Sequence, residues 1–205
     1  MNREPLTDVR VLALTGGIGS GKSVVSRCLR SMGIPVYDCD REARRLNESH
    51  PVIRQQLTEL VGNAVYDSEG RLDRAVLAGY LFADVDHARR VNAIIHPRVA
   101  EDFLHWKSCQ QGPWVAMESA ILYESGFDCL ADRVLMVYAP ECVRLQRAME
   151  RDGVSAEAVR RRMRNQLPDE EKREKADFTL YNDGRMPVLP QILDILGLLF
   201  CEIRE

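Results

Sequence analysis

The feature that most constrains the fold is a short apolar run followed directly by a glycine-rich turn. Residues 9–15 form a nearly continuous apolar, β-branched stretch, which is typical of a strand buried on both faces of a parallel sheet. Residues 16–23 read GGIGSGKS and match the pattern G-x-x-x-x-G-K-[ST]. Apolar residues then recur at helical spacing up to Gly33, which is well placed to end that helix. This order predicts a phosphate-binding loop (P-loop) between a strand and a helix.

The loop carries the groups that nucleotide phosphates require. Its glycines allow backbone N–H groups to wrap the phosphates, Lys22 supplies a point charge, and the Ser23 hydroxyl is a ligand for Mg²⁺. The helix that begins here adds the positive end of its dipole. The alternative is a merely structural glycine turn. We expect ATP to bind along Gly17, Ile18, Gly19, Ser20, Gly21, Lys22, Ser23 and Val24.

Further apolar runs complete a predicted sheet. They cover residues 34–38, 114–117, 133–138 and 178–181, and Pro190 precedes a closing amphipathic helix. Residues 51–111 show helical patterning without a convincing strand. With 205 residues, 45% of them hydrophobic, the chain suits one buried core. We predict a single α/β domain with the three-layer P-loop NTPase fold and a five-stranded parallel sheet. Its parts are a core (about 1–50, 112–140 and 176–205), a helical acceptor-binding insertion (about 51–111) and an Arg-rich lid (about 141–175).

Composition excludes several other classes of protein. The net charge of -3 gives no sign of a polyanion-binding surface, so we expect no nucleic-acid partner. The six cysteines lack zinc-site or disulfide spacing and are expected to be free thiols, mostly small buried hydrophobes, in a reducing compartment. The longest apolar stretch, residues 192–201, contains Asp194 and is too short to span a bilayer. These features predict a cytoplasmic protein without a membrane partner.

Other residues favour a kinase over the remaining P-loop classes. The Asn-Lys-x-Asp motif of a GTPase is missing from the sequence, and the strand ending in Asp-Glu of a motor ATPase has only a weak counterpart at residues 115–118. A kinase needs a carboxylate for the acceptor hydroxyl. Asp38 and Asp40 stand at the end of the second predicted strand, the edge where open α/β sheets bind ligands. The alternative role for Asp40 is to cap the following helix.

The segment between Glu141 and Lys175 is helical and rich in arginine. Its arginines would suit a mobile lid that closes over phosphates, but also a solvated surface with paired acids. Three of them share one helical face and four more follow: Arg144, Arg147 and Arg151, then Arg160, Arg161, Arg162 and Arg164.

The ordered motifs of the chain resemble those of the dephospho-coenzyme A kinase family over nearly its whole length. They are LTGGIGSGKS (14–23), VYDCD (36–40), IHPRV (95–99), LYE (122–124), LQR (145–147) with Arg151-Asp152, ADF (176–178) and NDG (182–184). Two positions depart from the family pattern. Val24 replaces a threonine that often follows the P-loop, and residues 119–124 lack the usual proline.

The resemblance implies transfer of the ATP γ-phosphoryl group to the 3'-hydroxyl of dephospho-coenzyme A, the last step of coenzyme A biosynthesis. By this resemblance Asp40 matches the proposed general base, Arg147 a lid arginine that reaches the ATP phosphates, and Asn182 a residue near the nucleotide. Lys22 and Arg147 would stabilise the transferring group, while Asp38, Asp40 and His96 would lie near the acceptor. The residues alone favour a helix end at His96, because a proline follows it.

Two alternatives stay open. One is a different P-loop kinase that acts on a nucleoside monophosphate or a sugar acid, which the His96-Pro97 insertion disfavours. The other is a regulatory or scaffold protein that binds ATP without transferring its phosphate, which the paired Asp38 and Asp40 disfavour. As partners we expect the small-molecule acceptor alone, with the chain a monomer or weak homo-oligomer.

Overall fold

The structure is a computed structural model that describes residues 9–202, whose contacts divide into two compact units. The first unit holds the described residues up to Tyr37 and from Cys109 onward, and the second comprises Asp38–Ser108. Each unit has its own core, and each is described by itself.

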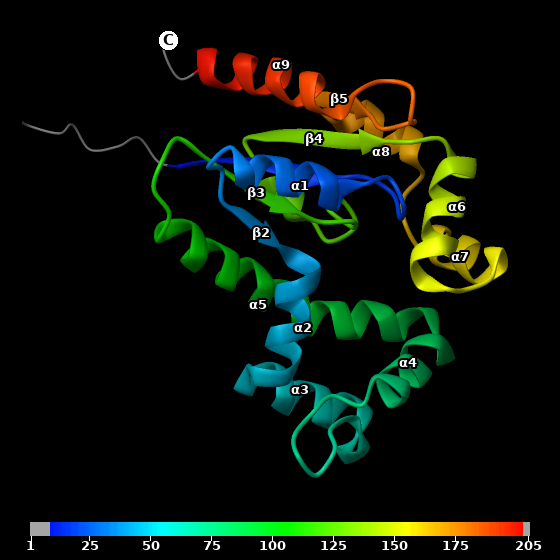
Figure 1. Cartoon of the computed structure of the whole chain (residues 1–205). Helices are drawn as coiled ribbons and strands as arrows, with labels where there is room; N and C mark the ends of the chain where they lie inside the picture. The colour runs from blue at the N-terminus through cyan, green and yellow to red at the C-terminus, as the bar shows by residue number, and fades with distance from the viewer. Residues whose placement is uncertain (1–8, 203–205) are drawn as a thin grey trace, which may run out of the picture. The chain divides into compact units, whose positions relative to one another are not determined.

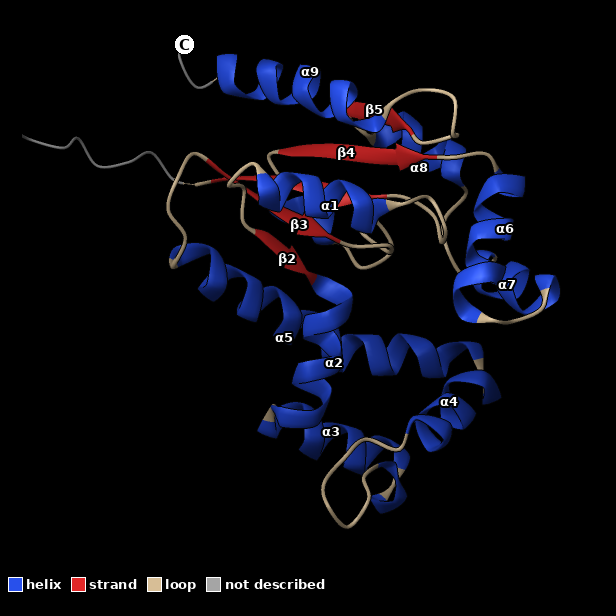
Figure 2. Cartoon of the chain, in the orientation of Figure 1, coloured by secondary structure: helices blue, strands red, loops and turns tan. Residues whose placement is uncertain are grey.

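The sheet has five strands in the order β2-β3-β1-β4-β5 (Figure 2). They are β1 (Arg10–Thr15), β2 (Val36–Asp38), β3 (Trp114–Glu118), β4 (Arg133–Tyr138) and β5 (Phe178–Tyr181). β1 lies at the centre and pairs in parallel with β3 and β4, and β4 pairs in parallel with β5. The predicted five-stranded α/β sheet is confirmed, and the continuous burial of β1 explains its continuous apolar run.

Helices cover both faces of this sheet (Figure 1). On one face, α1 (Lys22–Ser31) and α9 (Val188–Cys201) pack on alternate strand residues. A third helix, α8 (Asp169–Lys175), packs against β4. The shared core of the first face includes Leu12, Leu14, Val25, Leu29, Ala116, Leu135, Val137, Leu180, Ile192 and Leu199. This arrangement holds β1, and therefore the loop that follows it, from both sides.

The Arg-rich segment forms α6 (Glu141–Asp152), α7 (Ala156–Met163) and α8, and the 3-10 helix η2 (Phe127–Leu130) precedes β4. Part of this segment is a solvated surface with paired charges, because Asp152 accepts from Arg151 at 2.7 Å and from Arg162 at 2.6 Å. Arg144 differs from these exposed arginines because it is buried.

The second unit is built from helices, as predicted for residues 51–111, and it also includes residues 38–50, which were predicted to belong to the core. It contains α2 (Cys39–Ser49), α3 (Pro51–Val61), the 3-10 helix η1 (Asn63–Val65), α4 (Arg74–Ala83) and α5 (Val85–Ser108). An ion pair of 2.7 Å between Arg45 and Asp102 joins α2 to α5. Buried apolar side chains fill its interior: Leu46, Ile53, Leu57, Val65, Val91, Ile95, Val99 and Phe103.

Three local predictions were wrong. α5 continues through Pro97, because Val91, Ile95 and Val99 recur at helical spacing and their burial outweighs a proline cost of about 3 kcal/mol. α9 begins at Val188, so Pro190 lies in its first turn, where an intrahelical N–H bond is not needed. Among the free cysteines only Cys39 is buried, because most of the others stand at or near the ends of elements and are exposed: Cys109, Cys129, Cys142 and Cys201.

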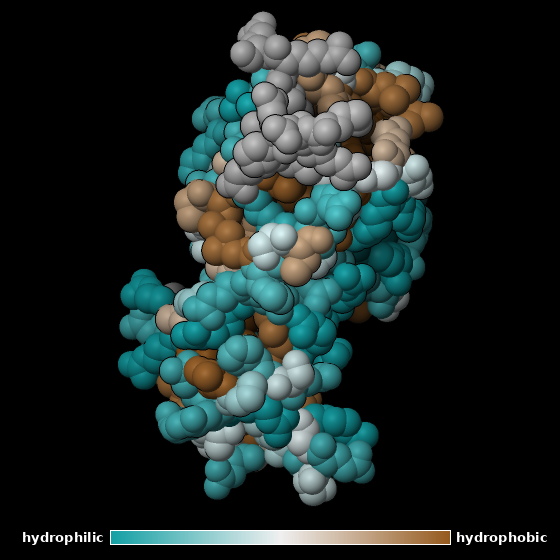
Figure 3. Space-filling view, turned by 90° about the vertical axis from the view of Figure 1, so that its left-hand side faces the viewer, coloured by the Kyte–Doolittle hydropathy of each residue, from teal (hydrophilic) through white to brown (hydrophobic). Residues whose placement is uncertain are grey.

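The surface drawn in Figure 3 shows hydrophobic residues as separate patches among hydrophilic ones. Exposed leucines such as Leu189, Leu193 and Leu198 belong to α9. Within residues 9–202 we find no helix of the length and apolar character that crossing a membrane requires.

Candidate active site

The glycine-rich loop presents uncapped backbone donors at the start of α1. Gly21 is the N-cap residue of α1 in a left-handed conformation (φ 99°), and no side chain caps the helix. The Val24 N–H bonds to the Gly21 carbonyl at 2.9 Å, and the start of the helix offers the positive end of its dipole to an anion. The Lys22 ammonium donates to the Gly16 carbonyl at 2.8 Å, and Ser23 is exposed beside it. This geometry suits phosphate binding.

Asn182 contacts the loop, and Arg147 contacts Asn182; the family resemblance places both near the nucleotide. The Asn182 amide donates to the Ser20 carbonyl at 2.8 Å, and Arg147 donates to the Asn182 carbonyl at 2.9 Å. A side chain at Gly21 would collide with the Asn182 amide, so a glycine is required there. Segments far apart in the sequence thus meet at the loop.

Arg144, one of the predicted lid arginines, forms a second contact to the loop together with Asp169, which sequence reasoning missed. Their ion pair measures 3.0 Å, and about 10% of each side chain is exposed. A Cβ atom at Gly17 would collide with Arg144 and lie 2.7 Å from an Asp169 oxygen. Burial raises the pKa of Asp169, while Arg144, Lys172 and Lys22 act to lower it. The first half of the loop therefore faces a buried pair of opposite charges.

A cavity of about 590 Å³ opens next to this pair. Its walls come from the end of β4, from α6, and from the segment that joins α7 to α8. The charged groups around it are three arginines and three acids, namely Arg144, Arg160, Arg164, Glu141, Asp169 and Glu170. The size suits a small molecule, and the arginines suit one that carries phosphate.

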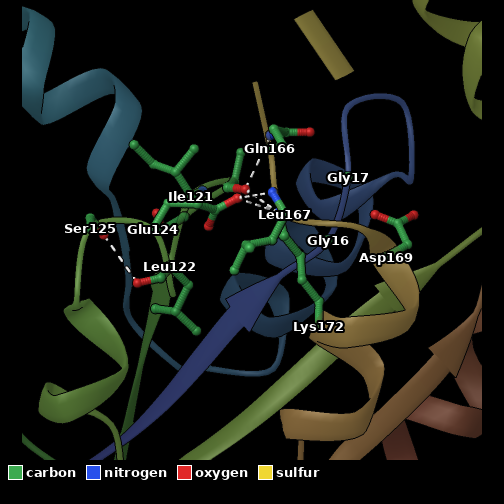
Figure 4. A network of polar contacts seen from close by, with 12 residues as sticks. Gly16, Gly17, Ile121, Leu122, Glu124, Ser125, Gln166, Leu167, Asp169 and Lys172 are labelled. Atoms are coloured by element: carbon green, nitrogen blue, oxygen red, sulfur yellow. Dashed lines mark hydrogen bonds and ion pairs between the residues drawn. The ribbon is translucent and has the colours of Figure 1, made fainter. Parts of the chain in front are cut away.

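A buried lysine fixes the segment that carries Asp169 (Figure 4). Lys172 has no exposed surface; it forms an ion pair of 3.0 Å with Glu124 and donates to the Ala120 carbonyl at 3.0 Å. Glu124 also accepts from the Leu167 N–H at 2.7 Å. These bonds tie α8, and Leu167 two residues before it, to the turns that follow β3. Glu124, which belongs to the LYE motif of the family resemblance, is therefore held in an internal network.

Gln166 links this network to the phosphate loop. Its side-chain carbonyl accepts from the Ile18 N–H at 3.0 Å, and its amide donates to the Ala120 carbonyl at 3.1 Å. Figure 4 shows Gln166 and Leu167 beside Gly16 and Gly17. One loop donor is thus already satisfied by the segment that joins α7 to α8.

The predicted acceptor residues belong to the second unit. Asp38 caps α2 by accepting from the Arg41 N–H at 3.0 Å, so the capping role considered for Asp40 falls to Asp38. Asp40 lies in the first turn of α2 and is exposed. His96 is half-buried within α5, and burial lowers its pKa, which favours the neutral imidazole near pH 7.

Comparison with known proteins decides the family. A family model described as dephospho-CoA kinase matches residues 10–187. The chain belongs to the dephospho-CoA kinase family. It is 49% identical over 193 residues to a dephospho-CoA kinase of Bacteroides fragilis, covering 94% of both chains. A Porphyromonas gingivalis dephospho-CoA kinase is 47% identical, with 90% of this chain and 92% of that one covered. A crystal structure of a Thermus thermophilus protein matches with a TM-score of 0.82 and 36% identity, covering 96% and 98%.

Family membership confirms the predicted enzyme class, a kinase of the P-loop type. The structure shows that two acidic residues of the family motifs fix the backbone. The Asp177 carboxylate accepts from the Val134 N–H at 2.7 Å and so ties the start of β5 to β4. Asp183 accepts from the N–H groups of Arg185 and Met186 and closes a turn, which lowers its pKa.

Proposed function

We propose that this protein transfers the γ-phosphoryl group of ATP to the 3'-hydroxyl of dephospho-coenzyme A, giving coenzyme A and ADP. The observation that carries the proposal is the phosphate loop at the start of α1, which Asn182 contacts and to which Arg147 is joined through Asn182. The family match of the chain runs from residue 10 to residue 187. The loop supports the nucleotide donor, and the family supports the acceptor.

The donor half of the reaction rests on fixed positive charge. Lys22 and the start of α1 would hold the β- and γ-phosphates, and Arg147 would neutralise charge on the transferring group. Asn182 holds the loop backbone through Ser20 and binds Arg147 through its own carbonyl. Preset donors of this kind stabilise a phosphoryl-transfer transition state without reorganising during the reaction.

The residues also fit Mg²⁺ as the partner of ATP. Ser23 is exposed in the first turn of α1, where its hydroxyl can serve as a metal ligand. No cluster of three or more His, Cys, Asp or Glu residues that could hold a metal occurs within residues 9–202. Mg²⁺ needs no such cluster, since it commonly uses one or two protein ligands together with phosphate and water. Bound there, the ion would offset phosphate charge.

Asp40 is assigned to the acceptor hydroxyl, whose proton it would take or orient. Asp38 caps α2, and Asp40 lies exposed in the first turn of that helix; the family resemblance assigns the general-base role to Asp40. A neutral His96 would bind the acceptor by hydrogen bonding rather than by charge.

The first test replaces Asp40 with Asn, which keeps the shape and removes the base. Turnover should fall roughly 10²–10⁴-fold while ATP binding stays largely intact. ADP release would be measured with and without dephospho-coenzyme A, and Asp86→Asn is the matched control, an acid in the first turn of α5 of the same unit. Near-normal turnover in Asp40→Asn would remove Asp40 from the mechanism. Absence of acceptor-dependent ADP release in the unmodified protein would refute the proposed function. ADP release that depends on a nucleoside monophosphate or a sugar acid would favour a different P-loop kinase.

A further inference from the structure

Arg144 is held on three sides at the phosphate loop. Its Nε donates to the Ala139 carbonyl at 3.0 Å, an Nη lies 3.0 Å from Asp169, and the other Nη faces Gly17 so closely that no side chain fits there. Only 8% of the residue is exposed. An arginine fixed in this way loses little freedom when it binds a further anion, because its fork is already oriented.

Asp169 is the group that fixes the outer part of the guanidinium. It is the first residue of α8, and it reaches back toward Gly17 instead of facing solvent. Its own position is rigid, because Lys172 on the next turn is anchored to Glu124 and to the Ala120 carbonyl. The pair is therefore part of a frame around the loop and unlike the exposed ion pairs of Asp152.

We propose that Asp169 is a positioning residue, which holds the Arg144 guanidinium at the first half of the phosphate loop as a preset cation for the transferring phosphoryl group. This inference rests on the proposed phosphotransferase function. A cation aimed at the place where charge develops accelerates the reaction step, whereas binding of the donor relies mainly on the loop amides and Lys22. Loss of Asp169 should therefore change kcat more than KM.

The experiment measures steady-state ADP release by the full chain for Asp169→Asn, which removes the charge and keeps the side-chain size. We expect kcat to fall about tenfold and the KM for ATP to stay within about twofold, since removing a direct donor costs more, about 10²–10³. The control is Glu171→Gln, an exposed acid in the same turn of α8 outside the cavity lining, which should match the unmodified protein.

A double-mutant cycle separates positioning from a structural role. If Asp169 acts through Arg144, then Asp169→Asn should lower kcat no further in an Arg144→Ala background. Additive effects, an unchanged kcat, or a change in KM alone would overturn the inference. Should Asp169→Asn fail to fold, Arg144→Lys carries the test, because lysine keeps the charge but cannot bridge Ala139 and Asp169. An unchanged kcat in that variant would overturn it. If the unmodified protein shows no acceptor-dependent ADP release, the proposed function fails. If the unmodified protein is active and the variants have the same kcat, the proposed function stands and this inference alone fails.

Discussion

Replacing Lys172 with Met should destabilise the protein more than any other lysine substitution on α8. Lys172 has no exposed surface, and its ammonium group lies 3.0 Å from both Glu124 and the Ala120 carbonyl. Methionine has a similar length and fills the same space, so the loss is electrostatic instead of a cavity. The Glu124 carboxylate, 19% exposed, would be left with the Leu167 N–H as its remaining partner in this network.

The loss in free energy of unfolding depends on the Glu124 carboxylate, which stays in place without its lysine partner. Removing one partner of a buried ion pair costs about 3–5 kcal/mol, because the other charge remains desolvated. Here Glu124 is partly exposed and the Ala120 carbonyl keeps its bond from Gln166, so we expect the low end, about 3 kcal/mol. In a domain of about 150–250 residues this corresponds to a fall of roughly 6–12 °C in the melting midpoint.

Thermal and urea unfolding would measure the effect. Lys175→Met is the control on the same helix, because Lys175 is exposed and its main contact is with the Tyr123 ring at 5.3 Å, worth about 1 kcal/mol at most. Adding Glu124→Gln to Lys172→Met should restore at least about 1 kcal/mol, since the orphaned charge is gone. A Lys172→Met protein as stable as the Lys175→Met control would refute the assignment of Lys172 as a buried anchor.

Two further predictions concern other polar groups. Tyr123→Phe should raise the free energy of unfolding by about 1 kcal/mol in urea, because the buried Tyr123 hydroxyl has no hydrogen-bond partner within residues 9–202. Burial, the main cause, raises the pKa of Tyr123 to about 12, so an absorbance titration of the variant should lose a tyrosinate step near that pH, and an unfolding energy below that of the unmodified protein would contradict this. Arg151 and then Arg162 lower the pKa of Asp152, so these ion pairs stabilise the fold fully above the ordinary aspartate pKa of about 3.9. The stabilisation is lost progressively as the pH falls from there toward the lowered pKa of the folded state. Asp152→Asn should therefore cost less than about 1 kcal/mol at pH 7, because the arginines are exposed, and the cost should shrink at pH 3, whereas an equal cost at both would refute the linkage.

Much of the fold was predictable because the relevant signals are local. The apolar runs at 133–138 and 178–181 matched the bounds of β4, whose interior is buried, and of the edge strand β5. The glycine pattern located the phosphate loop because phosphate binding dictates its backbone. The prediction of a helix end at His96 was wrong, because burial of the residues around Pro97 outweighs the local cost of a proline inside a helix.

The surroundings of the loop were less predictable, because their signals are not local. Asp169 follows Pro168 and precedes two glutamates, which is typical of a solvent-exposed helix start. Lys172 stands in a charged run that resembles a solvated helix, and Gln166 belongs to no motif. Each acquires its role from a partner far along the chain, such as Ile18 for Gln166. Arg147 and Asn182 were predicted only through the family resemblance.

The phosphate loop is supported by residues outside the glycine-rich motif, and the sequence alone does not indicate this support. Every residue at the mouth of the loop that sequence reasoning missed approaches from the α7–α8 segment or binds it: Gln166 donates to Ala120 and accepts from Ile18, and Asp169 holds Arg144 against Gly17. A segment that only covered bound nucleotide would not need a fully buried lysine. We therefore infer that α8 belongs to the rigid part of the site together with the start of α6, where Arg144 is held, and that any closing movement over ATP is confined to α7. Hydrogen exchange with and without an ATP analogue tests this, because α8 amides should be protected in both states, whereas protection of α8 that appears only with nucleotide would refute it.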